Sequence, residues 1–132
     1  MTIGAGVKFN IKDLSVWFGQ VQALKKVTLA VQPSEILSII GPSNSGKTSF
    51  LRMLNRLNEL NLNFRMAGEI KIDGDDLLRI DIEALRKRVG MVFALPLSLP
   101  LSIYDNVAYG VRMHGEKNKK KLEARVQAAL AE

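Results

Sequence analysis

Eight consecutive residues, GPSNSGKT at 41–48, have the types and spacing of a phosphate-binding loop. The pattern GxxxxGK(S/T) is met by Gly41, Gly46, Lys47 and Thr48. In such a loop the backbone N–H groups point at a bound anion, the lysine ammonium reaches the terminal phosphates, and the threonine hydroxyl can bind Mg²⁺. A glycine before the lysine lets the backbone approach the phosphate closely. The motif therefore predicts a site for the phosphates of a nucleotide.

The predicted binding residues are those of the loop and the residue after it. They are Gly41, Pro42, Ser43, Asn44, Ser45, Gly46, Lys47, Thr48 and Ser49, and Thr48 is also the predicted metal ligand. The alternative is an ordinary strand-to-helix turn with a lysine in the first turn of the helix. We favour phosphate binding, because the alternative must also explain the pattern on both sides of the loop.

The segments beside the loop predict the elements that position it. EILSIIG at 35–41 is a short and nearly continuous apolar run, typical of a strand buried on both faces of a parallel sheet. After the loop, apolar residues recur at helical spacing: Phe50, Leu51, Met53, Leu54 and Leu57. A buried strand before the loop and an amphipathic helix after it form the context that the motif requires.

The rest of the chain predicts an α/β fold. Segments 7–16 and 23–31 alternate apolar and polar residues, which indicates two antiparallel strands with one buried face. Further along we expect a strand and a turn closed by Gly74 in 68–77, a helix at 82–88 and a second buried strand at 89–94. After these we expect a helix over 102–115 with Ser102 as its cap, and a last helix from Lys119 onward. That last pattern reaches Glu132 without a cap, which suggests a cut and not a natural helix end.

Composition limits the classes of protein. With 132 residues and 47% hydrophobic residues, the chain can form a folded domain. The lack of cysteine excludes disulfides and thiolate metal sites, and we find neither an export signal nor an apolar run long enough to span a membrane. The net charge of +6 is compatible with nucleic acid, but no aromatic residues interleave with the lysines at 117–121, so a solvated helix face is favoured and no nucleic-acid partner is expected.

The sequence resembles the ATP-binding subunits of ABC transporters, and more narrowly the ATPase subunit of bacterial phosphate importers. The resemblance rests on GPSNSGKTSFLRMLNRLNEL, on GEIKIDGDDL and, most specifically, on SIYDNVAYG with RMHG after it. It implies an incomplete P-loop NTPase core of the RecA-like type, with an N-terminal antiparallel β-subdomain and the start of a helical subdomain. The implied boundaries are about 1–34 for the β region, about 35–94 for the core part and about 95–132 for the helical part.

The resemblance also implies a function. Proteins of this family bind ATP and Mg²⁺, work as a dimer of two nucleotide-binding subunits, and are held by permease subunits at the cytoplasmic face of the membrane. In VWFGQVQALKKVTL, the aromatic residue before the glycine, Phe18, is similar to the one that stacks on adenine, with Trp17 as a less favoured candidate. The alternative for Phe18 is packing in the core at the end of a strand.

Two positions depart from the family's pattern. Asn44 stands where the loop usually has glycine, but asparagine tolerates a positive φ better than other residues do, so we expect the loop to keep its shape. Ala94 stands where the family has a glutamine that helps to hold Mg²⁺ and the attacking water. A methyl group cannot do this, which predicts slower hydrolysis with ATP binding less affected.

Several of the family's catalytic parts are missing from these residues. No two glycines are adjacent, as the signature loop would need, and no acidic pair follows an apolar strand. We expect surface or turn roles for Asp73, Asp75, Asp76 and Asp105, and a solvated place at a helix end for His114. No catalytic residue is therefore assigned, and turnover by this chain alone is not expected.

Two other functions stay open beside that of an importer ATPase subunit. One is a nucleotide-binding remnant or regulator that holds ATP without hydrolysis, and the less favoured one is a basic nucleic-acid-binding domain. The resemblance further places the neighbours of both predicted buried strands outside these residues. We therefore expect exposed apolar edges and a tendency to aggregate.

Overall fold

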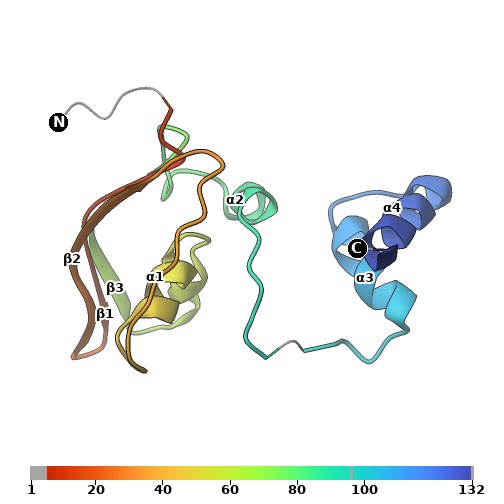
Figure 1. Cartoon of the computed structure of the whole chain (residues 1–132). Helices are drawn as coiled ribbons and strands as arrows, with labels where there is room; N and C mark the ends of the chain where they lie inside the picture. Colours follow the sequence, from red (N-terminus) through yellow and green to blue (C-terminus); the bar gives the residue numbers. More distant parts are fainter. Residues whose placement is uncertain (1–5, 96, 132) are drawn as a thin grey trace. The chain divides into compact units, whose positions relative to one another are not determined.

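The computed structural model describes residues 6–95 and 97–131 and divides the chain into two compact units (Figure 1). The first unit ends at Gly90 and the second begins at Met91. The first contains β1 (Phe9–Phe18), β2 (Val21–Val31), α1 (Lys47–Met53), the 3₁₀ helix η1 (Leu57–Leu60), β3 (Phe64–Ile72), β4 (Asp75–Asp76) and α2 (Ile82–Arg88). The second contains α3 (Ile103–Met113) and α4 (Lys119–Ala131).

The sheet of the first unit is antiparallel, with strand order β2-β1-β3-β4. β1 and β2 form a hairpin in which Phe9 pairs with Val31 and Phe18 pairs with Val21. The two antiparallel strands predicted from alternating residues are confirmed. β3 begins at Phe64, before the segment in which a strand was predicted, because its first residues pair with the end of β1.

One face of this sheet forms the core together with α1 (Figure 1). The buried residues are Ile11, Leu14, Val16, Leu24, Phe50, Met53, Ile70, Ile72, Leu77 and Leu85. Phe50 and Met53 are the buried residues of α1, as their helical spacing predicted. The helix after the loop is therefore fixed to the hairpin by apolar packing.

Arginine side chains fix the segment between α1 and α2. Arg56 donates to both carboxylate oxygens of Glu59, at 2.7 and 2.9 Å, and to the Ile80 carbonyl at 3.0 Å. The hydrogen bond to Glu59 is the largest cause that raises the pKa of the Arg56 guanidinium. Arg86 of α2 donates to the carbonyls of Asn55 and Arg56. These bonds hold the end of α1 against α2.

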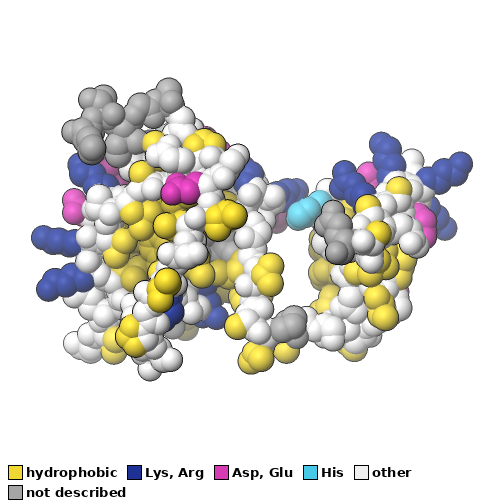
Figure 2. Space-filling view, in the orientation of Figure 1, with side chains coloured by type: hydrophobic (Ala, Val, Ile, Leu, Met, Phe, Trp, Pro, Cys, Tyr) yellow, Lys and Arg dark blue, Asp and Glu magenta, His cyan; other side chains and the backbone are white. Residues whose placement is uncertain are grey.

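The two predicted buried strands are not strands in this structure, so both predictions are wrong for it. Residues 35–41 and 90–94 have no regular secondary structure, and Ile36, Ile40 and Val92 are each more than 90% exposed. A strand needs a neighbour for its backbone N–H and C=O groups, and within 6–95 and 97–131 no segment pairs with either. Hydrophobic side chains accordingly lie at the molecular surface (Figure 2).

The second unit is a pair of helices, as predicted. Ala108 of α3 packs with Leu122 and Val126 of α4 in a small core. The Ser102 hydroxyl accepts from the Asp105 backbone N–H at 3.0 Å, which confirms Ser102 as the cap of α3. Among the residues that the structure describes, we find no helix with the length and apolar character needed to cross a membrane.

Candidate nucleotide-binding site

The predicted phosphate loop forms a tight turn directly before α1, which begins at Lys47. Asn44 has φ 62° and Gly46 has φ 90°, so both lie in the left-handed region of backbone space. The expectation that Asn44 adopts a positive φ is confirmed. Asparagine can take the place of glycine here because its short polar side chain tolerates this conformation.

Gly46 has a second constraint that the sequence did not reveal. A Cβ atom at this position would lie 2.5 Å from the Ala23 carbonyl oxygen and 2.8 Å from Leu24 Cδ2. Both are contacts that real Cβ atoms essentially never make. The loop therefore needs glycine for its close approach to β2, in addition to any approach to a phosphate.

The ammonium group of Lys47 is held by the loop itself. Nζ donates to the Gly41 carbonyl at 2.8 Å, to the Pro42 carbonyl at 2.5 Å and to the Ser45 hydroxyl at 3.2 Å. Lys47 is half-buried. The positive charge thus lies at the loop, where the motif requires it for contact with a phosphate.

A hollow of about 370 Å³ lies between the loop and the start of β2. Val21, Gln22 and Ala23 line it from β2, and Asn44 through Ser49 line it from the loop and the first turn of α1. Its volume is within the range of small-molecule sites, roughly 300–1,000 Å³. Six of the nine predicted loop residues are therefore brought together at one hollow, and Thr48 among them is exposed.

The other three predicted loop residues come directly before these six in the sequence. Gly41 and Pro42 act through their carbonyl groups, which accept from Lys47. Ser43 is exposed in the same turn as Asn44. The three β2 residues of the lining were missed by sequence reasoning, because only the packing of Gly46 against β2 brings them to the loop.

Phe18 lies at the end of β1, half-buried against the core. Its ring centroid is 6.0 Å from that of Phe64, with the two ring planes tilted by 46°. Phe18 is not among the residues that line the hollow. The neighbouring Trp17 has the guanidinium of Arg65 over its ring at 5.8 Å. Stacking of adenine on Phe18 stays a prediction.

Three carboxylates of the first unit, those of Asp73, Asp75 and Asp76, lie close to cationic side chains. Asp73 accepts from Lys8 at 2.9 Å and from Arg88 at 2.7 Å, and these hydrogen bonds, that of Lys8 first, lower the pKa of the Asp73 carboxyl. Asp75 lies 4.0 Å from Arg88, and Asp76 lies 3.5 Å from Arg79. These three carboxylates have the surface and turn roles that were expected.

The second unit contains the other two groups considered for chemistry. Asp105 accepts from the Ser102 hydroxyl at 2.6 Å and from Arg112 at 2.6 Å, and these bonds, Ser102 first, lower the pKa of its carboxyl. His114 is exposed at the C-terminal end of α3, as expected. Within the described part of the chain, no three His, Cys, Asp or Glu side chains gather as metal ligands would.

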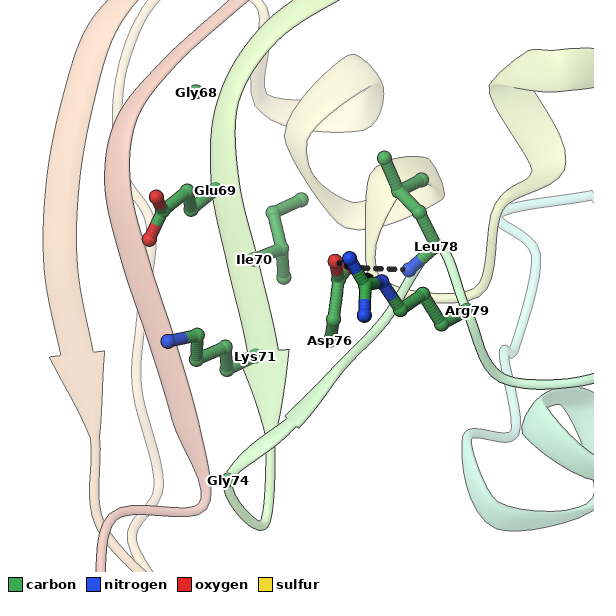
Figure 3. Close-up of a pocket in the computed structure, with 8 residues that line it drawn as sticks. All are labelled: Gly68, Glu69, Ile70, Lys71, Gly74, Asp76, Leu78 and Arg79. Carbon is green, nitrogen blue, oxygen red and sulfur yellow. Dashed lines mark hydrogen bonds and ion pairs between the residues drawn. The ribbon is translucent and has the colours of Figure 1, made fainter.

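A second hollow of about 370 Å³ lies beside β3 and β4 (Figure 3). Its lining carries both signs of charge, from Glu69, Lys71, Asp76 and Arg79. Asp76 accepts from the Leu78 backbone N–H at 3.0 Å and pairs with Arg79, as the dashed lines in Figure 3 mark. The one carboxylate near the centre of this lining is thus already partnered.

Ala94 is exposed in the segment that follows the first unit. Its methyl group offers no hydrogen-bond donor or acceptor. The segment around it therefore contributes no polar side chain at the position where a glutamine was expected.

The sequence matches the family model of the ABC transporter over residues 24–132. This chain belongs to the ABC transporter family. Phe18 and the rest of β1 precede the matched range, whereas the whole phosphate loop lies within it. The match supports the family named by the sequence resemblance, and it leaves the phosphate-importer subfamily without support of its own.

Solved structures show the same fold. The ATP-binding cassette MJ0796, in a dimeric post-hydrolysis state bound to ADP and inorganic phosphate, is similar with a TM-score of 0.75 and 26% identity over 93% of this chain. A bacterial Atm1-family ABC exporter with ATP bound has a TM-score of 0.69 and 23% identity over 83% of this chain, and this likeness concerns the fold alone.

These matches confirm the predicted fold class. The antiparallel β-subdomain and the helices after it correspond to part of the P-loop fold of an ABC ATPase. The chain spans 56% of the length of the MJ0796 structure and 18% of that of the exporter.

Proposed function

We propose that this chain binds the phosphates of ATP, with Mg²⁺, at the loop formed by residues 41–49. The observation that carries the proposal is the hollow at the loop, where Lys47 and Thr48 line one space with the backbone of Asn44 through Gly46. The ammonium of Lys47 is already at the loop and needs only to exchange its partners for phosphate oxygens. The ADP and phosphate bound to MJ0796 support the choice of an adenine nucleotide.

Equilibrium binding of ATP, measured by calorimetry with and without Mg²⁺, tests this proposal. Lys47→Ala removes charge-assisted hydrogen bonds and is expected to weaken binding roughly tenfold to a hundredfold. Thr48→Val keeps the side-chain shape but is expected to remove the gain that Mg²⁺ brings. Lys25→Ala is the matched control, since Lys25 is exposed on β2 outside the hollow. Equal loss in Lys25→Ala and Lys47→Ala would contradict the proposal.

We further propose that the chain acts as part of the ATPase subunit of an importer for inorganic phosphate. The segment SIYDNVAYG with RMHG, which forms α3 and its end, supports this narrower choice. A second nucleotide-binding subunit and membrane permease subunits are the proposed partners, at the cytoplasmic face of the membrane. Copurification with a permease, followed by uptake of labelled phosphate against labelled sulfate, tests the proposal. Equal uptake of both anions would contradict phosphate specificity.

A second candidate is a nucleotide-binding protein without turnover, and Ala94 favours it. The methyl group of Ala94 can bind neither the attacking water nor Mg²⁺. We therefore expect ATP to be bound and not cleaved. Release of phosphate from ATP, measured with saturating ATP and Mg²⁺, separates the two functions. Sustained release that Lys47→Ala abolishes would remove this second candidate.

A further inference from the structure

The face of the sheet that points away from α1 carries mostly basic side chains (Figure 2). Alternate residues of a strand leave opposite faces of a sheet, and the neighbours of these side chains in the sequence pack in the core. Figure 3 shows this in β3, where Glu69 and Lys71 project from the side opposite to Ile70. We call this surface the outer face. Its exposed charged residues are Lys12, Lys25, Arg65, Glu69 and Lys71, with Asp13 and Lys26 at the irregular positions of the pairing between β1 and β2.

The positive charge of the outer face is only partly compensated. Five of its charged side chains are basic and two are acidic, which leaves an excess of three positive charges. Glu69 lies opposite Lys12 in the pairing of β1 and β3. None of the seven side chains forms an ion pair with another described residue, however. The outer face therefore attracts an anionic surface that lies opposite to it.

The only tryptophan of the chain lies on the same face. Val16 and Phe18, on either side of Trp17, belong to the core, so the half-buried indole leaves the sheet on the outer face. The guanidinium of Arg65 lies over its ring at 5.8 Å and donates to the Gly19 carbonyl at 3.2 Å. Proteins that bind single-stranded nucleic acid stack successive bases on several aromatic rings, whereas this face has one indole that a cation already covers. An indole among basic side chains is typical of a surface that meets lipid headgroups.

We propose that the outer face docks on a lipid bilayer with anionic headgroups. The ammonium and guanidinium groups attract the negative charges of the headgroups, and each basic side chain near such a surface raises the affinity about fivefold. A bilayer offers a broad anionic surface, so this contact needs no cavity in the protein. The proposal goes beyond nucleotide binding and is independent of the loop at 41–49.

Sedimentation of the full chain with lipid vesicles tests the proposal. We expect binding to vesicles of phosphatidylcholine with phosphatidylserine, and weaker binding as NaCl rises above about 0.1 M. The triple substitution Lys12→Gln, Lys25→Gln and Lys71→Gln should lower the partition coefficient roughly tenfold to a hundredfold. Glu69→Gln should raise it about two- to fivefold, a gain that a misfolded chain would not show. The emission of Trp17 should shift to shorter wavelength in the same titration.

The matched control removes the same charge from the second unit. Lys119→Gln, Lys120→Gln and Lys121→Gln, all exposed on α4, should leave the partition coefficient unchanged within about threefold. An equal loss in both triple variants would overturn the proposal, because total charge and not the outer face would be responsible. Equal binding to vesicles of phosphatidylcholine alone would do the same, as would binding without a shift in the emission of Trp17. Tighter binding of a single-stranded oligonucleotide, with the same shift, would replace the bilayer with nucleic acid.

Discussion

Asn44 shows how one residue type can preserve a backbone shape that usually needs glycine. At φ 62°, it lies in the turn whose residues Asn44 to Gly46 line the hollow. Its side chain is exposed, so the constraint on this position comes from the backbone and not from packing. The identity of the residue should therefore affect ligand binding more than folding.

We predict that Asn44→Val weakens ATP binding roughly five- to thirtyfold, because a β-branched residue in the left-handed region costs roughly 1–2 kcal/mol. Asn44→Gly should bind at least as tightly as the unsubstituted chain. Calorimetry measures both constants. Ser43→Val is the control, since Ser43 is exposed in the same turn but is not among the residues with positive φ. Weakening by Ser43→Val as large as that by Asn44→Val would count against a backbone cause.

Gly46 differs from Asn44, because both packing and backbone conformation constrain this position. Gly46→Ala should lower the free energy of unfolding of the first unit by at least about 1–3 kcal/mol, since the new Cβ meets the Ala23 carbonyl at φ 90°. The measurement is urea unfolding. Gly90→Ala in the same unit is the comparison: nothing lies within 4 Å of its Cβ, so no comparable loss is expected. A Gly46→Ala chain as stable as the parent would contradict the close contact.

At the scale of elements, Asp73 joins three parts of the first unit. It lies after β3, and its partners are Lys8 before β1 and Arg88 at the end of α2. The pKa of the Asp73 carboxyl is lowered in the folded chain. A lowered pKa means that the ionised carboxyl stabilises the folded chain. This stabilisation is fully present above the pH at which the carboxyl ionises in the unfolded chain. It is lost as the pH falls through the lowered value.

We predict that Asp73→Asn lowers the urea midpoint at neutral pH and that the difference from the parent disappears well below about pH 4. Asparagine keeps the left-handed backbone of this position, where φ is 51°, so only the ion pairs are removed. Asp13→Asn is the matched control, since Asp13 has φ 50° and no ion pair with a described residue. A difference that persists in acid would assign the effect to something other than the charge.

The elements that were predicted correctly are those whose signals are local. Alternation predicted the β1–β2 hairpin, helical spacing predicted α1, and Ser102 predicted the start of α3. The buried strands expected at 35–41 and 89–94 depend on neighbours elsewhere in the chain, and a continuous apolar run does not reveal whether those neighbours are present. The same reason explains Val21, whose place at the hollow follows from strand register and from the packing of Gly46.

At the scale of the whole molecule, the exposed apolar segments determine how copies of the chain associate. Ile36 and Ile40 lie before the loop, and Val92, Leu95 and Leu97 lie after α2, each at least 81% exposed. In each segment the backbone N–H and C=O groups also have no neighbouring strand to pair with among the described residues. Exposed apolar segments with unpaired backbone groups promote association between copies of a chain.

We predict that the chain self-associates as its concentration rises and that the double substitution Ile36→Lys and Ile40→Lys reduces this association. Light scattering over a concentration series measures it. Leu62→Lys is the control, because Leu62 is fully exposed in a turn and does not belong to these segments. If Leu62→Lys suppressed self-association equally, added charge alone would be responsible, and not the loss of the apolar surface at Ile36 and Ile40.

The bonds of Lys47 to its own loop have a consequence for any measured affinity. A phosphate that binds must replace the carbonyls of Gly41 and Pro42 as partners of the ammonium. Binding is thus an exchange reaction, and the heat released reports the difference between two sets of hydrogen bonds and not the strength of the new set. The free loop competes with its own ligand for a single cation.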